Sequence, residues 1–274
     1  MVLKKDFSPP KSDLTCCMDM YVNTRVWACV CVFHCDFLFE LPRNCVRRSE
    51  GLRGYVPSRS SLVDDALQFI NEHVRARMDI SSKLFVIGTS MGGAITTLCA
   101  LEEELKHGIE GIVLLSPMLW IRDVSALEEY GLSLLAAIAG SWAIMPGVSQ
   151  DASTKHHTDP LMRKLIDEDT LCYQGGLRAK TAYTLVQICA ELAQRVEELS
   201  TPFLVFMGTH DAVVDPTRAT WMLNTTVLVE EEDKRCVEIK GGLHGLLCGE
   251  VETRTRILGD IESWIRERCQ ISDR

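Results

Sequence analysis

A serine lies in a glycine-rich turn between an apolar stretch and a segment that suits a helix. The turn Gly88–Gly92 has the sequence Gly-Thr-Ser-Met-Gly, and the apolar residues Leu84–Ile87 precede it. A Cβ on either glycine would clash in so tight a turn, and the central residue is expected to be strained. Gly-x-Ser-x-Gly alone is a weak signal, but the strand before it and the helix after it favour Ser90 as a nucleophile. The N–H of Met91 would then face a developing oxyanion.

A serine hydroxyl becomes a good nucleophile only when a base removes its proton and an acid orients that base. Two further expected strands each end in a loop that carries a suitable residue. Asp211 follows Phe203–Met207, and His244 follows Arg235–Ile239 in a loop flanked by glycines. The order Ser, Asp, His along the chain is the order found in α/β-hydrolases. These three residues are the predicted catalytic set.

Other acids and histidines compete with Asp211 and His244 for these two roles. Asp215 is close to Asp211, but Pro216 follows it, and Asp before Pro is a good start for a helix. Five other histidines lie near expected helix ends, in an expected insertion at about 118–200 or next to Asp211; they are His73, His107, His156, His157 and His210. The sixth, His34, lies beside Cys35 in the Cys-rich N-terminal segment. The sequence therefore favours Asp211 as the acid and His244 as the base.

The elements around these loops alternate between strands and helices. A helix with apolar residues at helical spacing is expected after Ser60 or Ser61. Strands are expected at Leu84–Ile87, Ile109–Leu115, Phe203–Met207 and Arg235–Ile239. A helix from the serine turn to about Lys106 and a last helix near 250–268 complete the pattern. This order predicts an α/β fold with a mostly parallel sheet and right-handed crossovers. The alternation stops at about 118–200, where an all-helical insertion is expected to form a cap over the strand ends.

Seven short motifs together resemble the monoacylglycerol lipase and lysophospholipase branch of the α/β-hydrolases, which is grouped with the serine aminopeptidase-like hydrolases. They are Arg48–Gly51, Gly88–Gly93, Leu114–Pro117, Leu171–Arg178, Pro202–Val205, Gly208–Asp211 and Gly242–His244. The resemblance implies an α/β-hydrolase fold with a helical cap. It also implies Ser90 as nucleophile, Asp211 as acid, His244 as base and Met91 as one oxyanion donor, with no cofactor and no metal.

Residues 1–47 depart from that family and are treated as a separate Cys-rich segment, with the hydrolase domain at 48–274. A His-Gly motif, which supplies the other oxyanion N–H in the family, is absent, and so is Gly-His-Gly ahead of Arg48. The early strands are expected to be missing or replaced, although an apolar strand can be placed within 25–41. Because removing one oxyanion donor typically lowers kcat by about 10²–10³-fold, the sequence predicts a weak enzyme.

Composition excludes several other classes of protein. The 274 residues carry a net charge of -9 without a basic stripe, which argues against a nucleic-acid partner. The 12 cysteines are scattered, no secretory signal is recognisable, and Cys29, Cys31 and Cys35 lack a usual zinc spacing. A cytoplasmic protein with free thiols is expected. No apolar stretch is long enough to span a membrane, so any membrane contact is expected to be peripheral and through the cap.

The sequence thus predicts a serine hydrolase that cleaves carboxylic esters, most of all monoacylglycerols or lysophospholipid-type lipids, through an acyl-enzyme. Two alternatives remain open at this point. One is a catalytically impaired hydrolase-fold protein that binds acyl ligands or a partner, and the other is a peptidase of the same superfamily.

Overall fold

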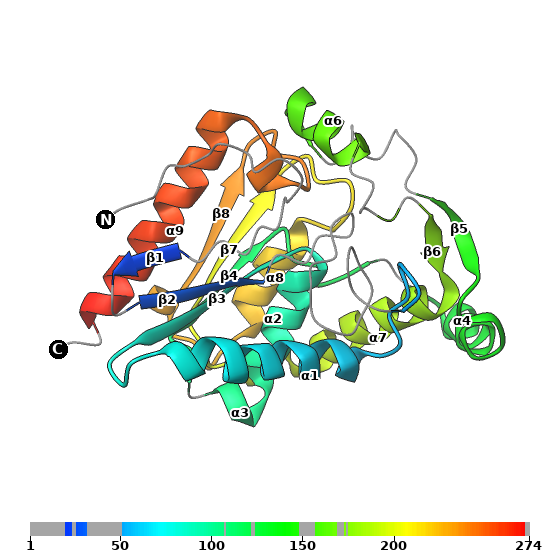
Figure 1. Ribbon diagram of the computed structural model, residues 1–274, viewed down its shortest axis with the longest axis horizontal. Coiled ribbons are helices and arrows are strands. Elements are labelled where there is room, and N and C mark those ends of the chain that lie inside the picture. Colours follow the sequence, from blue (N-terminus) through cyan, green and yellow to red (C-terminus); the bar gives the residue numbers. More distant parts are fainter. Residues whose placement is uncertain are drawn as a thin grey trace.

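The computed structural model describes residues 20–23, 26–31, 51–106, 108–121, 124–147, 157–168, 173 and 175–271. Within these residues the central element is a six-stranded sheet with the order β1-β2-β3-β4-β7-β8 (Figure 1). Its strands are β1 (Met20–Asn23), β2 (Val26–Cys31), β3 (Lys83–Thr89), β4 (Gly111–Leu115), β7 (Phe203–Gly208) and β8 (Lys234–Ile239). Neighbouring strands from β2 to β8 are parallel, and β1 pairs with β2 in the antiparallel direction. The mostly parallel α/β sheet expected from the sequence is confirmed.

The central strands are apolar throughout because helices cover both faces of the sheet. All residues of β4 and β7 are buried, as are those of β3 after Lys83. Such continuous burial is typical of parallel sheets, in which neither face meets water. The main helices are α1 (Arg59–Phe69), α2 (Met91–Leu101), α7 (Ala179–Arg195), α8 (Thr217–Thr225) and α9 (Val251–Ile271). Figure 1 shows α9 on one side of the sheet and α1 and α2 on the other.

The α9 face of the sheet is anchored by a tryptophan. Trp264 is fully buried, and its ring meets Phe85 of β3 edge-on with a centroid distance of 5.9 Å. The ring also lies against Gly111, where a Cβ would collide with it. A large aromatic side chain therefore fills the space that the glycine of β4 leaves open.

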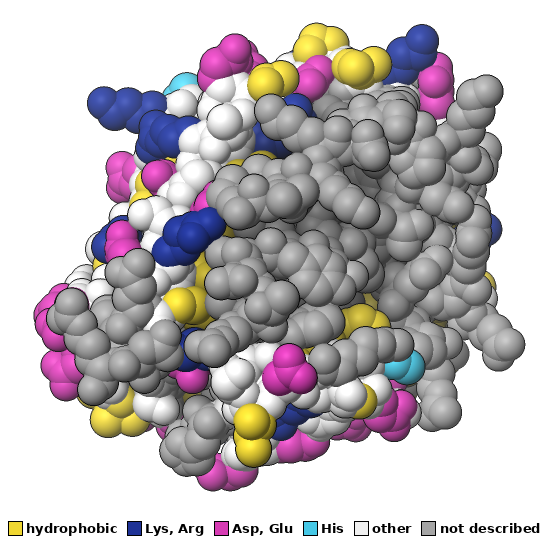
Figure 2. Space-filling view, turned by 60° about the vertical axis from the view of Figure 1, so that its left-hand side comes forward, with side chains coloured by type: hydrophobic (Ala, Val, Ile, Leu, Met, Phe, Trp, Pro, Cys, Tyr) yellow, Lys and Arg dark blue, Asp and Glu magenta, His cyan; other side chains and the backbone are white. Residues whose placement is uncertain are grey.

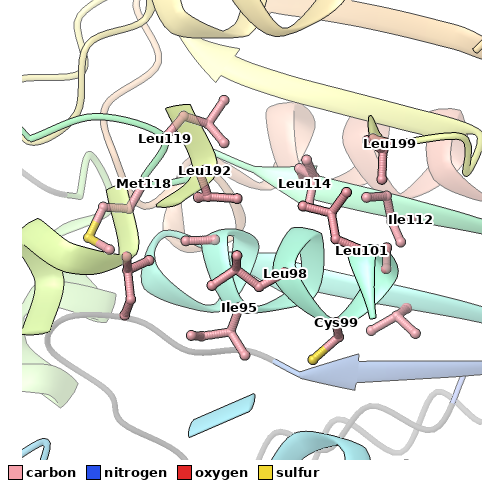
Figure 3. Packing of buried hydrophobic residues seen from close by; sticks show 14 of the residues in the cluster. Ile95, Leu98, Cys99, Leu101, Ile112, Leu114, Met118, Leu119, Leu192 and Leu199 are labelled. Atoms are coloured by element: carbon pink, nitrogen blue, oxygen red, sulfur yellow. The ribbon is translucent and has the colours of Figure 1, made fainter. Parts of the chain in front are cut away.

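The opposite face is the larger core, and α2 runs through its middle. Ile95 and Leu98 of α2 are fully buried among Leu114 of β4 and Leu192 of α7 (Figure 3). Every residue of α2 is buried, so this helix is enclosed on all sides. The turn before α2 is consequently held by a rigid element.

The segment between β4 and β7 contains α4 (Ala126–Ala139), β5 (Ala143–Gly147), α6 (Pro160–Glu168), β6 (Gly176–Arg178) and α7. It is not all-helical, because β5 and β6 pair as a separate two-stranded antiparallel sheet. In Figure 1, α4, β5, β6 and α6 lie beyond the end toward which the parallel strands run. By contrast, Ile188 and Leu192 of α7 are completely buried in the larger core, so α7 belongs to the body of the fold.

One other expectation differs from the structure. The helix after the serine turn ends at Leu101, and a separate short helix α3 (Glu103–Lys106) follows. Glu102 between them has an extended backbone, and Arg59 and Arg195 both reach its carboxylate. At the N-terminus, β2 lies within the 25–41 stretch and occupies the place beside β3, so a strand does fill this position. Of the cysteines in the N-terminal segment, Cys29 and Cys31 lie in β2, whereas Cys35 lies outside the described residues.

Short helical segments complete the chain. They are η1 (Ile70–Val74), η2 (Arg75–Arg77), η3 (Val196–Glu198), η4 (Glu231–Asp233) and η5 (Leu246–Cys248). On the face shown in Figure 2, basic and acidic side chains are interspersed over the described part of the surface. In the part of the chain that the structure describes, every helix is too short or too polar to cross a membrane.

Candidate active site

Ser90 lies between β3 and α2 in a conformation that few non-glycine residues adopt. Its φ is 53° and its ψ is -121°, as expected for a strained turn. Hydrogen bonds hold the backbone in place: Ser90 N donates to Leu115 O at 3.0 Å, and Ser90 O accepts from Met118 N at 2.9 Å. The neighbouring strand β4 and the loop after it therefore fix the strained residue.

Two glycines allow the turn to close. A Cβ on Gly88 would collide with the carbonyl of Gly92, and a Cβ on Gly93 would lie 2.7 Å from Pro117 Cβ. The first obstacle is backbone, which cannot move away as a flexible side chain can. The sequence therefore needs glycine at 88 for a steric reason that the structure makes explicit.

We expect Gly88→Ala to lower the free energy of unfolding by about 1–3 kcal/mol, the usual cost of overpacking, and to lower activity by displacing Ser90. Gly131→Ala on α4 is the matched control, since a Cβ there meets nothing within 4 Å. That substitution should leave stability unchanged or raise it by up to about 1 kcal/mol. Chemical denaturation of both variants measures the difference. Equal stability of Gly88→Ala and the wild type would contradict the steric argument.

The structure brings the three predicted residues together. His244 Nε2 lies 2.8 Å from Ser90 Oγ, and His244 Nδ1 lies 2.8 Å from Asp211 Oδ2. The side chains of His244 and Asp211 are fully buried. With Asp211 ionised, His244 Nδ1 carries the imidazole proton and donates a hydrogen bond to the carboxylate. Nε2 is then the acceptor for the Ser90 hydroxyl.

Asp211 is held as a carboxylate. Burial by itself raises its pKa, but hydrogen bonds from His244, Val213 N and Val214 N outweigh burial and bring the pKa below the usual range. The two backbone donors lie 2.8 Å and 3.1 Å from Asp211 Oδ1, so the second oxygen remains available to His244. An ionised, immobilised carboxylate is what an imidazole base needs to keep one tautomer and one orientation.

The loops that carry Asp211 and His244 are joined directly. Thr209 N donates to Ile239 O at 3.0 Å, and Thr209 Oγ1 accepts from Gly241 N at 2.9 Å. Gly208 lies against Gly242, where a Cβ on Gly208 would collide with the backbone. The sequence marked these glycines only as loop residues, and their close approach becomes apparent in three dimensions.

The competing residues lie apart from this hydrogen-bonded set. Asp215 Oδ1 accepts from Thr217 N at 2.9 Å at the start of α8, which is the capping role expected from the sequence. The side chain of His210 is exposed next to Asp211, and that of His73 packs against Phe69. His157 is buried in the segment before α6, while His107 and His156 lie outside the described residues.

Met91 is the first residue of α2 and is almost fully buried. The first N–H groups of a helix have no acceptor one turn earlier, so they are oriented toward the space in front of the helix. β2 runs parallel to β3, with Cys31 opposite Gly88. The loop that follows β2 lies outside the described residues. The absence of a second oxyanion donor therefore remains a prediction.

The described residues include no cluster of His, Cys, Asp and Glu that could hold a metal ion.

Comparison with known proteins gives a consistent result. Residues 47–252 match the family described as serine aminopeptidase, S33. Caffeoylshikimate esterase of Arabidopsis thaliana is 26% identical over 81% of this chain and 67% of that protein. Monoglyceride lipase of Mus musculus is 27% identical over 81% of this chain and 70% of that protein.

Solved structures show the same fold. A soluble variant of monoglyceride lipase from Saccharomyces cerevisiae, in complex with a substrate analog, matches with a TM-score of 0.70 and 17% identity. The match covers 90% of this chain and 89% of that one. A carboxyl esterase from Bacillus coagulans, in complex with glycerol, matches with a TM-score of 0.61 and 17% identity over 78% of this chain and 73% of that one.

Proposed function

Because this chain belongs to the serine aminopeptidase S33 family and has the α/β-hydrolase fold, we propose that it hydrolyses carboxylic esters through an acyl-enzyme on Ser90. The observation that carries the proposal is the hydrogen-bonded series Ser90, His244 and Asp211, with both distances at 2.8 Å. Relatives named as esterases and lipases support the ester class. The order of these residues along the chain supports the same assignment.

In the first half of the proposed reaction, Ser90 Oγ attacks the ester carbonyl carbon while His244 Nε2 takes the hydroxyl proton. The carbonyl oxygen becomes an oxyanion, to which Met91 N–H donates a hydrogen bond. The tetrahedral intermediate collapses when the bond to the leaving alkoxide breaks, and His244 returns the proton to that oxygen. The products are an alcohol and an acyl-Ser90 ester.

In the second half, a water molecule attacks the acyl carbonyl and His244 takes one of its protons. The bond to Ser90 Oγ then breaks, Ser90 regains its proton from His244 and the carboxylic acid leaves. Asp211 remains ionised throughout and stabilises the imidazolium that forms in each half. This assignment requires no cofactor or metal.

We propose monoacylglycerols and lysophospholipid-type lipids as the substrates. Support comes from the monoglyceride lipases among the relatives and from the motifs shared with that branch. The test is turnover of three matched substrates by the purified chain: a 1-monoacylglycerol, a lysophospholipid and a peptide amide. Faster cleavage of either lipid ester than of the amide is expected. Cleavage of the peptide alone would favour the peptidase alternative, and the absence of all turnover would favour the impaired one.

We further propose that, within the residues of about 118–200 expected as a cap, the part that precedes α7 covers the site of a hydrolase domain formed by residues 48–274, while α7 itself packs in the larger core. Within this cap, α4 carries large apolar side chains at helical spacing that point outward. Leu127, Tyr130, Leu134 and Ile138 are 80%, 62%, 45% and 86% exposed, and Trp142 just beyond the helix is 68% exposed. Residues at this spacing share one face of a helix. The α4 apolar face suits peripheral contact with a lipid surface, where the lipid substrate would be found.

The double variant Leu127→Glu/Ile138→Glu should bind neutral phosphatidylcholine vesicles about 10²-fold to 10⁴-fold more weakly than the wild type, because each leucine-sized side chain contributes about 1.5–3 kcal/mol on burial. Turnover of a short soluble ester should not change. Glu129→Lys alters the charge of the same helix outside the apolar face, and it serves as the control. Vesicle co-sedimentation measures binding. Unchanged sedimentation of the double variant would contradict the proposed contact.

A further inference from the structure

The loop after β4 and the start of α8 meet in a stacked contact between an arginine and a tryptophan. The Cζ atom of Arg218 lies 4.0 Å from the centroid of the Trp120 ring, and 6.0 Å from that of Trp221. The side chain of Arg218 is 28% exposed, so the guanidinium is largely shielded from water. Arginine stacks well on aromatic faces because its guanidinium is planar and weakly hydrated.

Trp120 belongs to a segment that is fixed to the nucleophile. Met118 N donates to Ser90 O at 2.9 Å, and the Sγ of Cys189 on α7 lies 3.7 Å from Met118 O. Met118 and Leu119 are 3% and 1% exposed. The loop that presents the Trp120 ring is therefore packed against the strained serine turn.

Arg218 belongs to the segment that carries the acid. Val213 N and Val214 N both donate to Asp211 Oδ1, and the chain then enters α8 through Asp215. Arg218 N donates to Asp215 O at 3.1 Å, and Arg218 Nε lies 3.6 Å from Asp215 Oδ2. Because the backbone bond to Asp215 O does not depend on the charge of the Asp215 side chain, a shift of Arg218 would reach the turn that presents Asp211 through the backbone.

We propose that Arg218 is a positioning residue, which aligns the Asp211 turn with the Ser90 turn by stacking on Trp120. The stack joins the segment that is fixed to the nucleophile turn to the segment that carries the acid. Arg218 touches no reacting atom in this role. It acts through Asp211, because His244 can face Ser90 correctly only while Asp211 holds its Nδ1. The inference rests on the proposed hydrolase function, and it assigns that site a further residue.

The experiment compares Arg218→Met, which keeps most of the side-chain stem, with Arg218→Lys, which keeps a cation over the ring. Arg218→Met should lower kcat for a soluble ester by about 10-fold to 100-fold, the range expected for a small displacement of catalytic groups, with little change in KM. Arg218→Lys should recover most of that loss. Trp120→Leu should reproduce the Arg218→Met effect, and the double variant should be no worse than either single variant.

Asp215→Asn keeps the cap on α8 and removes the charge that pairs with Arg218, so it should retain wild-type kcat. If Asp215→Asn loses as much activity as Arg218→Met while Trp120→Leu loses none, the ion pair and not the stack is responsible, and the proposal is wrong. Wild-type kcat in Arg218→Met would overturn it as well. If Arg218→Met does not fold, the comparison of Arg218→Lys with Trp120→Leu decides between these outcomes.

A second readout does not depend on turnover. A proton shared between His244 Nδ1 and Asp211 gives a far-downfield proton resonance, assigned by its absence in Asp211→Asn. This signal should weaken or shift upfield in Arg218→Met and Trp120→Leu, and it should persist in Arg218→Lys. An unchanged resonance in both loss variants would refute the positioning role. Failure of the wild type to cleave any ester, with the resonance responding as expected, would instead count against the proposed function.

Discussion

Replacing Ser90 with alanine is expected to lower ester turnover by about 10⁴-fold or more and to abolish covalent labelling by a fluorophosphonate probe. The substitution removes Oγ, the atom that attacks the carbonyl and that lies 2.8 Å from His244 Nε2. Alanine fits the site sterically, because its Cβ replaces that of serine at the same backbone angles. The folded structure should therefore survive, with a melting temperature close to that of the wild type.

Ser116→Ala is the matched control for this experiment. Ser116 is also fully buried beside the site and also has a positive φ, of 44°. If labelling reports an activated nucleophile, it should persist in Ser116→Ala and disappear in Ser90→Ala. Equal labelling of the Ser90 variant and the wild type would remove the assignment of Ser90 as nucleophile.

Asp211→Asn is expected to lower kcat by about 10⁴-fold, as an amide in this position does in other serine hydrolases. The amide cannot stabilise an imidazolium as a carboxylate does. Its NH₂ group next to Nδ1 also favours the tautomer with the proton on Nε2, and that tautomer cannot accept the proton of Ser90. KM should change little, since the loss falls on the transition state. Steady-state kinetics with a soluble ester measures both parameters.

Asp215→Ala tests the competing acid. Because Asp215 accepts hydrogen bonds from Thr217 N and Thr217 Oγ1, its loss should cost about 1 kcal/mol of stability as a lost helix cap, while kcat remains near the wild-type value. The two acids are thus distinguished by what their variants lose: kcat in Asp211→Asn, and stability in Asp215→Ala. A folded but inactive Asp215→Ala, together with an active Asp211→Asn, would reverse the assignment.

The sequence predicted the central sheet, and it predicted that Ser90, Asp211 and His244 lie in loops that such a sheet brings to one edge. Long apolar stretches such as Phe203–Met207 can be buried only in covered strands, and β7 spans this stretch. Loops that follow parallel strands emerge at one edge of the sheet, so Ser90, Asp211 and His244 were predictable as neighbours from chain order and strand pattern. Their separation of 2.8 Å at each step is consistent with that expectation.

Contacts between distant segments were not predictable, because single residues with no periodic pattern make them. Glu102, where the helix breaks, pairs with Arg59 and Arg195, neither of which is close to it in the sequence. Trp120 and Arg218 likewise give no local signal of their stacking. The sequence analysis missed the β5–β6 pair because both strands are short and neither alternates between apolar and polar residues. β6 has three residues, and all of them are half-buried.

The hydrogen bond between His244 and Ser90 joins residues 154 positions apart, and this separation governs when activity can first emerge during folding. The strands that carry the three residues are parallel, so each pairing closes a long loop whose entropy is lost before contacts compensate for it. β8 is the last strand of the sheet in the sequence, and the His244 loop comes after it. A nascent chain released up to the end of α8 would hold Ser90 and Asp211 but would lack His244, the base. The appearance of esterase activity after dilution from denaturant should therefore mark the docking of β8, and partly folded chains should be inactive while they still expose an unpaired strand edge.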